Sequence, residues 1–541
     1  MRPIVSVAAD LGLAESDLVP YGRDVAKVEL AAVAAASSRR RGKVLLVTAM
    51  TPSEHGEGKT VTAIGLAMAL ERAGHRAVPC LRQPSLGPVF GVKGGATGGG
   101  LATVEPSNRI NLGFTGDLRA VADAQNLLAA IVDNHLHHGN RAGLDPAGIE
   151  VPRTLDLDDR ALRHVRVGAG PKIGPERADR FVIAAASETA SIHQLATGPE
   201  DLEQRLDRLL VGHRPDGGIV TARALGASGA MAALLGDAIR PNLVQTREGT
   251  PALVHAGPFA NLGTGTASVV SIRLALGRAD FAVVEAGFAA DLGAEKFVDL
   301  VGPVGGFLPD AAVLVATIVG LRHHGGVAAG PTHPDADAVN RGLANLDHHI
   351  GILRALGVRT VVALNRHPSD SDPEIAIVLD HLAEADVPLA VSTTFLEGSA
   401  GAAELAARVV EAVQKGSTPR PITGPGTGWR SRLETIAQRV YGAAEVRFTP
   451  EAEADAAGIE AAGLSTAPVL MAKTPLSITD DPRRLGAPTG FPVTVTRLRR
   501  WAGAGFVVAE LGPILTMPGL PEHPHAERIR LSARGEVEGV E

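Results

Sequence analysis

The sequence has a single cysteine, Cys80, in 541 residues. One thiol cannot form a disulfide within the chain, and it cannot build a zinc site of several cysteines. Aromatic residues are also scarce: they make up 3% of the chain, with only two tryptophans and two tyrosines. An aromatic residue in a polar or glycine-rich setting is therefore a candidate for ligand binding.

Other absences limit where the protein can be located and which partners it can bind. No stretch approaches the roughly 18 apolar residues of a membrane-spanning helix. Residues 1–15 lack the basic region and apolar run that are typical of a signal peptide. The formal net charge is −7, which gives no electrostatic reason to bind nucleic acid. We expect a cytoplasmic enzyme with no membrane and no nucleic-acid partner.

Short apolar runs alternate with longer amphipathic segments along the chain. Residues 43–50 predict a buried strand and residues 61–74 a helix, and further buried strands are predicted at 281–285, 311–315 and 360–364. This alternation indicates an α/β fold, with a phosphate-loop NTPase-like parallel sheet as its core and two smaller α/β domains. We place domain boundaries at 1–355, 356–440 and 441–541, with a glycine- and proline-rich linker at 414–428.

The strongest motif is Gly56-Glu57-Gly58-Lys59-Thr60, between a predicted strand and a predicted helix. Backbone N–H groups of such a turn can surround phosphate oxygens, and the helix N-terminus adds positive potential. Lys59 would neutralise the β- and γ-phosphates of a nucleotide, and Thr60 would bind Mg²⁺. Ser53 replaces the first glycine of the full motif, so a plain glycine turn is the alternative. Glu285, at a strand end, is either a carboxylate behind the magnesium or a simple strand-end charge.

A second glycine-rich segment spans residues 91–100, close to Arg82 and Lys93. Both cations suit a carboxylate or a phosphate. The alternative is a flexible surface loop. Asp117 opens a predicted helix over 117–138, where it would cap the helix or orient a cation or a lysine.

Two groups of histidines are candidates for a metal site. His135 and His138 have helical spacing suited to a metal, and His323 and His324 are adjacent. Neither group has a nearby carboxylate signature, so the sequence does not favour a metal at either place.

Long segments of the chain resemble formate–tetrahydrofolate ligases, from residue 43 to about 529. The similar segments are TPSEHGEGKT, QPSLGPVFGVKGG, FTGD, DAIRPNLVQTREGTPALVHAGPFAN, EAGFAADLGAEKF, PDAAVLVATIVGLRHHGG and AGAGFVVAELGPILTMPGLP. The resemblance implies that ATP phosphorylates formate to formyl phosphate. Tetrahydrofolate then takes the formyl group, which gives 10-formyltetrahydrofolate, ADP and phosphate. It also implies magnesium, a monovalent cation and a homotetramer.

The resemblance implies a role for each candidate residue. The first domain would bind nucleotide and formate, and residues 356–440 would lie on the folate side. Lys59 and Thr60 match the family's ATP-phosphate and magnesium groups, and Arg82 matches the arginine that holds formate and the acyl phosphate. Asp117 matches a carboxylate near the folate amine. Phe288 and Phe395 match aromatic positions that sandwich the pterin ring, Phe395 standing where the family usually has Trp.

The sequence departs from the family pattern on the formyl-transfer side. Gly113, Arg119 and Thr264 stand where the family usually has His. In addition, Gln83 replaces a usual Glu, and His367 replaces an aromatic residue. One alternative is therefore a divergent paralogue that binds or hydrolyses ATP with weak or altered acyl transfer. Another is a nucleotide-switched, partner-binding protein. His55, inside the phosphate loop, is a candidate to compensate for the missing histidines.

Overall fold

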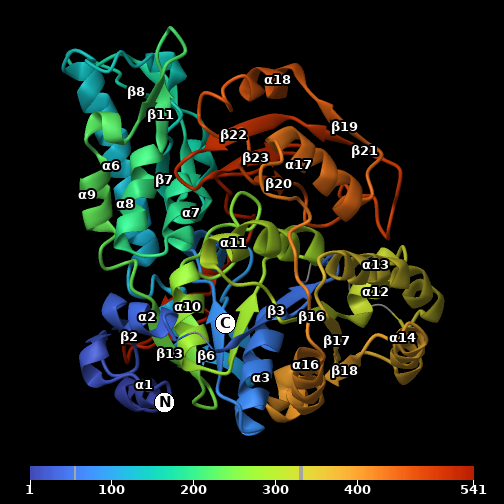
Figure 1. The fold of residues 1–541 in the computed structure, drawn as a ribbon. Helices are drawn as coiled ribbons and strands as arrows, with labels where there is room; N and C mark the ends of the chain where they lie inside the picture. The colour runs from blue at the N-terminus through green and yellow to red at the C-terminus, as the bar shows by residue number, and fades with distance from the viewer. Residues whose placement is uncertain (40, 54–55, 328–332, 541) are drawn as a thin grey trace.

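The computed structural model describes residues 1–541 except 40, 54–55, 328–332 and 541. A 12-stranded sheet forms its centre (Figure 1). Seven neighbouring strands of this sheet run parallel, which confirms the α/β prediction. In spatial order they are β14 (Pro251–Val254), β4 (Ala77–Leu81), β15 (Phe281–Glu285), β3 (Lys43–Ala49), β16 (Ala311–Ala316), β17 (Thr360–Asn365) and β18 (Leu389–Ser392).

Antiparallel strands extend the sheet beyond β14. Strand β13 (Asn242–Thr246) pairs with β14, with β2 (Ala26–Val28) and with β6 (Ala102–Glu105). Strand β1 (Leu18–Pro20) pairs with β2, and β5 (Gly98–Gly99) with β6. The glycine-rich segment therefore continues into a small hairpin at the edge of the sheet.

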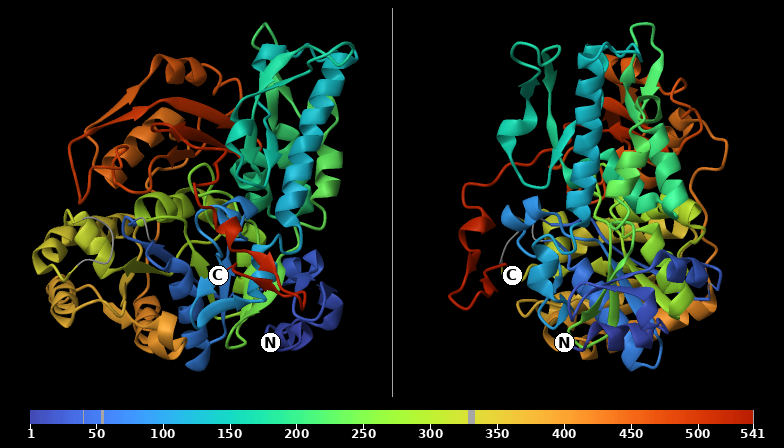
Figure 2. Two further views of the ribbon diagram at one scale, coloured as in Figure 1. Left: turned by 180° about the vertical axis from the view of Figure 1, so that it is seen from behind. Right: turned by 90° about the vertical axis from the view of Figure 1, so that its left-hand side faces the viewer.

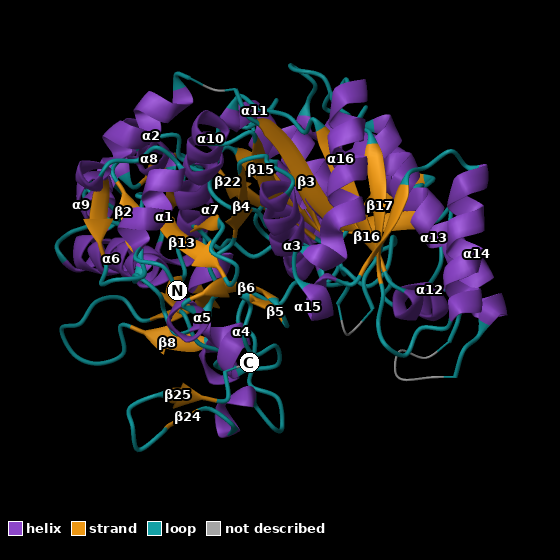
Figure 3. Cartoon of the chain, turned by 90° about the horizontal axis from the view of Figure 1, so that it is seen from below, coloured by secondary structure: helices purple, strands orange, loops and turns teal. Residues whose placement is uncertain are grey.

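Helices cover both faces of the sheet (Figure 3). Leu45 and Val47 of β3 pack on one side with α3 (Lys59–Arg72) and α16 (Ala403–Lys415). Val44 and Leu46 alternate with them and pack on the other side, with α2 (Leu30–Ser37) and α10 (Val269–Arg278). Burial on both faces explains why β3 is a continuous apolar run. Further helices at this sheet are α1 (Ile4–Asp10), α12 (Ile318–His324), α13 (Ala336–Ala355), α14 (Asp372–Glu384) and α15 (Thr394–Glu397).

Residues between Asp117 and Leu234 form a separate layer (Figure 1, cyan to green). Its helices are α6 (Asp117–His137), α7 (Glu188–Leu195), α8 (Pro199–Arg208) and α9 (Ser228–Leu234). Its strands form two-stranded sheets: β7 (Arg153–Leu155) with β10 (Phe181–Ile183), β8 (Val165–Val167) with β9 (Arg177–Asp179), and β11 (Leu210–His213) with β12 (Ile219–Thr221). We call this the middle layer.

Residues 429–511 fold beside the middle layer, whereas the C-terminal end runs back to the glycine-rich segment near the main sheet (Figure 2, orange to red). Residues 429–511 contain α17 (Trp429–Ile436), α18 (Pro450–Ala456) and a parallel pair, β19 (Glu445–Phe448) with β21 (Pro492–Val495). A second small sheet has the order β20 (Val469–Ala472), β23 (Phe506–Glu510), β22 (Arg497–Trp501). A hairpin of β24 (Arg530–Leu531) and β25 (Val537–Glu538) follows.

The proposed boundary at residue 355 is not marked by a break in the main sheet. Strands β17 and β18 lie beyond it and still extend the parallel sheet from β16. The three domain ranges therefore stay a prediction. In the part of the chain that the structure describes, no helix has the length and apolar character needed to cross a membrane.

Candidate active site

The main candidate residues meet at one edge of the sheet. Strands β4, β15 and β3 are parallel neighbours, so their carboxyl ends lie side by side. Arg82 follows β4, Glu285 ends β15, and the phosphate loop follows β3. In open α/β sheets this edge is where ligands bind.

The phosphate loop is held by its own glycines and by an inward-facing glutamate. Gly56 and Gly58 have φ angles of 75° and 74°, a conformation that favours glycine. Glu57 is only 2% exposed, and its Oε1 accepts the Ser53 N–H at 2.9 Å. The Thr317 hydroxyl donates to its Oε2. Glu57 therefore braces the loop through its side chain, which leaves its main chain as the part that can reach a phosphate.

Three cationic side chains, Lys59, Arg82 and Lys93, lie around Glu285. The Thr60 hydroxyl donates to Glu285 Oε2 at 3.0 Å, and Arg82 Nη2 lies 3.9 Å from Glu285 Oε1. The Nε of Arg82 is buried and has no hydrogen-bond partner among the described residues. Burial lowers the pKa of Lys59, an effect that Glu285 and Glu57 oppose and that Arg82 and Lys93 reinforce. An anion entering this cluster would relieve the repulsion among Lys59, Arg82 and Lys93.

The glycine-rich segment is anchored by the far end of the chain. Gly95 N–H donates to the Val540 carbonyl at 2.8 Å, and His525 N–H donates to the Gly91 carbonyl at 2.8 Å. The His525 ring also lies against Gly94, where an added Cβ would be 3.1 Å from it. These contacts hold the loop that carries Lys93, so this segment is not a free surface loop.

Asp117 is buried and fully paired. It is the first residue of α6, and Gly116 stands in the N-cap position, so the prediction that Asp117 caps the helix is wrong by one residue. Instead its Oδ1 accepts Lys27 Nζ at 2.7 Å and its Oδ2 accepts Asn242 Nδ2 at 2.7 Å. The alternative that Asp117 orients a lysine is the one that this geometry matches.

The two predicted stacking aromatics come from different places on the sheet edge. Phe395, in α15 after β18, is 54% exposed and lies against Gly99. Phe288 follows β15 and has a φ of 58°, which is unusual for a residue with a side chain. Three strands separate β15 from β18, which is about 19 Å at roughly 4.8 Å a step. The two rings would reach one pterin only through their loops.

Comparison with known proteins identifies the family. The family model for formate–tetrahydrofolate ligase matches residues 1–541. The ligase of Symbiobacterium thermophilum is 48% identical over 543 residues, which cover 100% of this chain and 98% of that protein. The ligase of Thermus thermophilus is 48% identical over 542 residues, covering 100% and 99%, and that of Roseiflexus sp. is 47% identical over 551 residues, covering 100% and 98%. The chain belongs to the formate–tetrahydrofolate ligase family.

The positions where this ligase-family chain lacks a usual histidine have three different environments. Gly113 has a φ of 95° and open space where a Cβ would lie. Arg119 is exposed on α6. Thr264 is fully buried, with its hydroxyl 3.4 Å from that of Thr266. Gln83 is 3% exposed, and neither polar atom of its amide has a partner among the described residues.

A buried histidine pair was missed by the sequence analysis. His193 and His255 have ring centroids 5.0 Å apart, and the Nε2 atoms of both lie within 2.8 Å of the Ala238 carbonyl. That carbonyl accepts, so both rings carry the proton on Nε2. Burial lowers the pKa of each, which keeps both neutral. Only the position of His255 inside the VHAGPFAN segment, directly after β14, could have drawn attention to it.

The histidines considered for a metal make other contacts. His135 Nε2 accepts the Ala142 N–H at 2.9 Å, and His324 Nε2 lies 3.0 Å from the Thr51 carbonyl. Among the residues that the structure describes, no group of three or more His, Cys, Asp or Glu side chains is arranged to hold a metal. The proposed compensating residue, His55, and its neighbour Glu54 lie outside the described residues.

Proposed function

We propose that this chain ligates formate to tetrahydrofolate at the expense of ATP, with formyl phosphate as the intermediate. The observation that carries the proposal is the meeting of Lys59, Thr60 and Arg82 around Glu285, in a chain that belongs to this ligase family over its full length. The products are 10-formyltetrahydrofolate, ADP and phosphate.

ATP would bind with its β- and γ-phosphates in the loop between β3 and α3. The main-chain N–H groups of Gly58 and Lys59 and the N-terminus of α3 favour phosphate oxygens. The Lys59 ammonium neutralises charge that builds up on the γ-phosphoryl group during transfer. The Thr60 hydroxyl, already directed at Glu285, fits a magnesium ion that takes its other ligands from phosphates and water. Bound magnesium would supply charge neutralisation at the transferring phosphate.

Formate would be held beside the γ-phosphate by Arg82. A guanidinium with a free Nε can hold a carboxylate through two parallel hydrogen bonds, and the Nε of Arg82 has no partner among the described residues. One formate oxygen attacks the γ-phosphorus, the bond to the β,γ-bridging oxygen breaks, and ADP leaves. Arg82 and Lys93 then face the dianionic phosphate of the formyl phosphate, which keeps the intermediate in place.

Tetrahydrofolate would stack on Phe395. This ring is more than half exposed next to the hairpin β5–β6, a position suited to a flat heterocycle. The folate N–H nitrogen attacks the formyl carbon, the C–O bond to phosphate breaks, and phosphate leaves with the bond electrons and takes up the proton that the nitrogen loses. Asp117, paired with Lys27, orders the wall of the site on the β2–β13 side. Phe288 is the second proposed stacking residue.

The experiment is a coupled assay of ADP release by the purified protein, with formate and tetrahydrofolate each added or omitted. The proposal expects release that requires both acceptors and equals the 10-formyltetrahydrofolate formed. ADP release that is independent of both would overturn it in favour of the divergent ATP-binding paralogue. The loss of histidine at Gly113, Arg119 and Thr264 is the observation that favours that second candidate.

The assembly and the cations belong to the same proposal. We expect a homotetramer, which light scattering after gel filtration can measure, and a cytoplasmic location. We also expect a monovalent cation to activate the enzyme, as the family resemblance implies. No residue is assigned to this cation. Stimulation of the assay by added potassium or ammonium ions would support it.

A further inference from the structure

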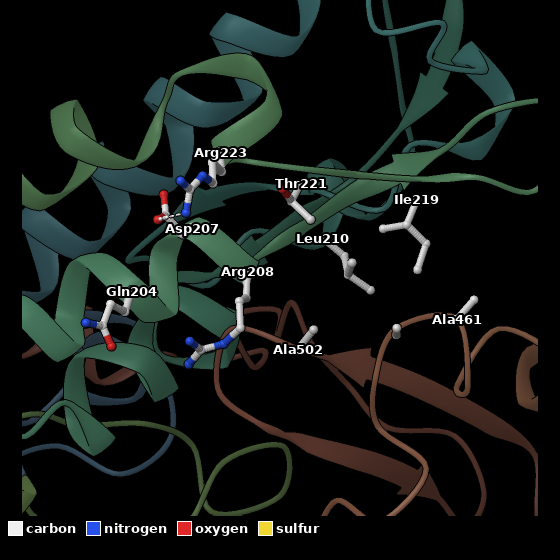
Figure 4. Close-up of a pocket in the computed structure, with 10 residues that line it drawn as sticks. Gln204, Asp207, Arg208, Leu210, Ile219, Thr221, Arg223, Ala461 and Ala502 are labelled. Carbon is white, nitrogen blue, oxygen red and sulfur yellow. Dashed lines mark hydrogen bonds and ion pairs between the residues drawn. The ribbon is translucent and has the colours of Figure 1, made fainter.

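A cavity of about 500 Å³ lies at the seam between the middle layer and the C-terminal sheet. One wall comes from the middle layer, around residues 147–152, Arg180 and Glu188, and the other from strand β22. Leu210 also lines a second, more open cavity of about 450 Å³ (Figure 4). Both cavities lie at a seam that the ligase residues described above do not reach.

Four arginines line the larger cavity, and they differ in the number of hydrogen bonds that each makes to a carboxylate. Arg497 forms a two-point ion pair with Asp455, through Nε at 2.7 Å and Nη2 at 3.2 Å. Arg499 pairs with Glu510 through Nε alone, and Arg500 with Glu150 through Nη2 alone. Among the described residues, the remaining N–H groups of Arg499 and Arg500 have no side-chain acceptor, so they are available to a ligand.

Arg180 differs from the other three arginines because no described carboxylate is hydrogen-bonded to its guanidinium. It is partly buried, and neither a hydrogen bond nor an ion pair of its guanidinium occurs among the described residues. Burial lowers the pKa of Arg180, and the nearby Arg499 and Arg497 lower it further, whereas Asp179 and Glu150 oppose this effect. A partly buried cation that faces like charges without a partner is unfavourable. An anion in the cavity would remove that penalty.

The carboxyl group of Glu188, on the same wall as Arg180, adds a hydrogen-bond donor. Glu188 Oε1 accepts the N–H groups of Gly503 and Ala504 at 2.8 and 3.1 Å. Burial raises the pKa of Glu188 to about 8, which favours the neutral carboxyl group at neutral pH. A protonated carboxyl group donates to an anionic oxygen and does not repel it.

Part of the remaining lining is apolar, which favours an organic ligand over a bare ion. Val182, Leu209, Leu498 and Trp501 face the same cavity. A cavity of this volume, lined by both charged and apolar side chains, is large enough for a small organic anion.

We propose that this seam cavity binds a small organic acid with two or more carboxylates, held by Arg180, Arg499 and Arg500. The site is separate from the ligase chemistry, so the proposal does not depend on the proposed function. Its occupant would join the middle layer to the C-terminal sheet, because its carboxylates would contact both walls.

The test is isothermal titration of the full-length protein with citrate as the probe. We expect saturable binding that weakens at least tenfold in Arg180→Ala and in Arg180→Gln. The matched control is Arg208→Ala, because Arg208 is exposed at the neighbouring cavity (Figure 4), and it should bind citrate like the parent. Since citrate could also enter the phosphate loop, Lys59→Ala is a second control that should retain seam binding.

Three results would overturn the proposal. The first is the absence of citrate binding to the parent protein. The second is equal loss of binding in the Arg180 and Arg208 variants, which would place the ligand elsewhere. The third is equally tight binding of inorganic phosphate, which would show a general anion effect. If both Arg180 variants unfold, Arg499→Gln serves as the third variant, with the same tenfold weakening expected.

Discussion

The nucleotide side and the folate side of the candidate site are built differently. On the nucleotide side, Lys59, Thr60, Arg82 and Glu285 come from the ends of three adjacent strands and meet directly. On the folate side, Phe288 and Phe395 follow strands with three others between them. In the proposed site, phosphate chemistry would depend on side chains at the rigid sheet edge, whereas pterin binding would depend on loops.

The same difference separates most of the retained residues from the changed ones; Gln83, directly after Arg82, is an exception. The motif that follows β3 is intact from Gly56 to Thr60, and the departures from the family pattern fall outside it, at Gln83, Gly113, Arg119 and Thr264 among others. Positions fixed by adjacent strand ends tolerate few alternatives, because one strand step is only about 5 Å. A change at a loop position can be offset by a change in a neighbouring segment.

The largest effect is expected from Lys59→Ala, on the nucleotide side. Removing the ammonium should lower the kcat/KM for ATP by roughly a hundred- to a thousandfold, the range for loss of one charge-stabilising donor. Steady-state kinetics with saturating formate and tetrahydrofolate measure it. Lys43→Ala is the matched control, since Lys43 begins the same strand and pairs with Asp310 at 3.0 Å. Equal activity of Lys59→Ala and the parent would disprove the phosphate-loop assignment.

The second effect concerns the acid, in Arg82→Lys. A lysine keeps the charge but cannot form two parallel bonds to a carboxylate. The loss should be about 1.5–3 kcal/mol, or roughly ten- to a hundredfold in kcat/KM for formate. The KM for ATP serves as the internal control and should change much less. An unchanged dependence on formate concentration would show that Arg82 does not hold the acid.

The third prediction compares the two aromatic residues, Phe395 and Phe288, on the folate side. Phe395→Ala should raise the KM for tetrahydrofolate by roughly two- to tenfold, the worth of an aromatic contact, and should leave the KM for ATP nearly unchanged. Phe288→Ala should act more weakly on tetrahydrofolate, because its strand lies nearer the nucleotide. Simultaneous loss of both substrates together with a lower melting temperature would indicate core packing as the role of the residue tested.

The smallest effect is expected from restoring family histidines. Gly113→His has room for the side chain but places it at a φ of 95°, so we expect a less stable protein with activity within about twofold of the parent. Thr264→His, at a fully buried site, should cost about 1–3 kcal/mol by overpacking. Assays of 10-formyltetrahydrofolate and thermal melts measure both. A large gain in activity would mean that the parent is an attenuated ligase.

The main sheet could be predicted from the sequence because its strands are short apolar runs buried on both faces. Strands 43–49, 281–285, 311–316 and 360–365 fall where the pattern placed them. The strand order could not be predicted, since β3 pairs with strands far along the chain. The middle layer was also missed as a unit, because its strands have only three or four residues each.

The site was predictable where a local motif defines it. The GEGKT segment needs only its own glycines and the following helix, so Lys59 and Thr60 could be named from sequence. The inward turn of Glu57 toward Thr317 and the pairing of Asp117 with Lys27 depend on segments more than 80 residues away. No local pattern reports such contacts.

Strand β3 has a consequence for how the protein is made. Both of its neighbours in the sheet, β15 and β16, begin at or beyond Phe281. At the usual speed of translation the ribosome needs on the order of ten seconds or more to reach them after β3 has been synthesised. During that time an apolar strand with two open edges is exposed on the nascent chain, which makes the segment that carries the phosphate loop a natural client for molecular chaperones.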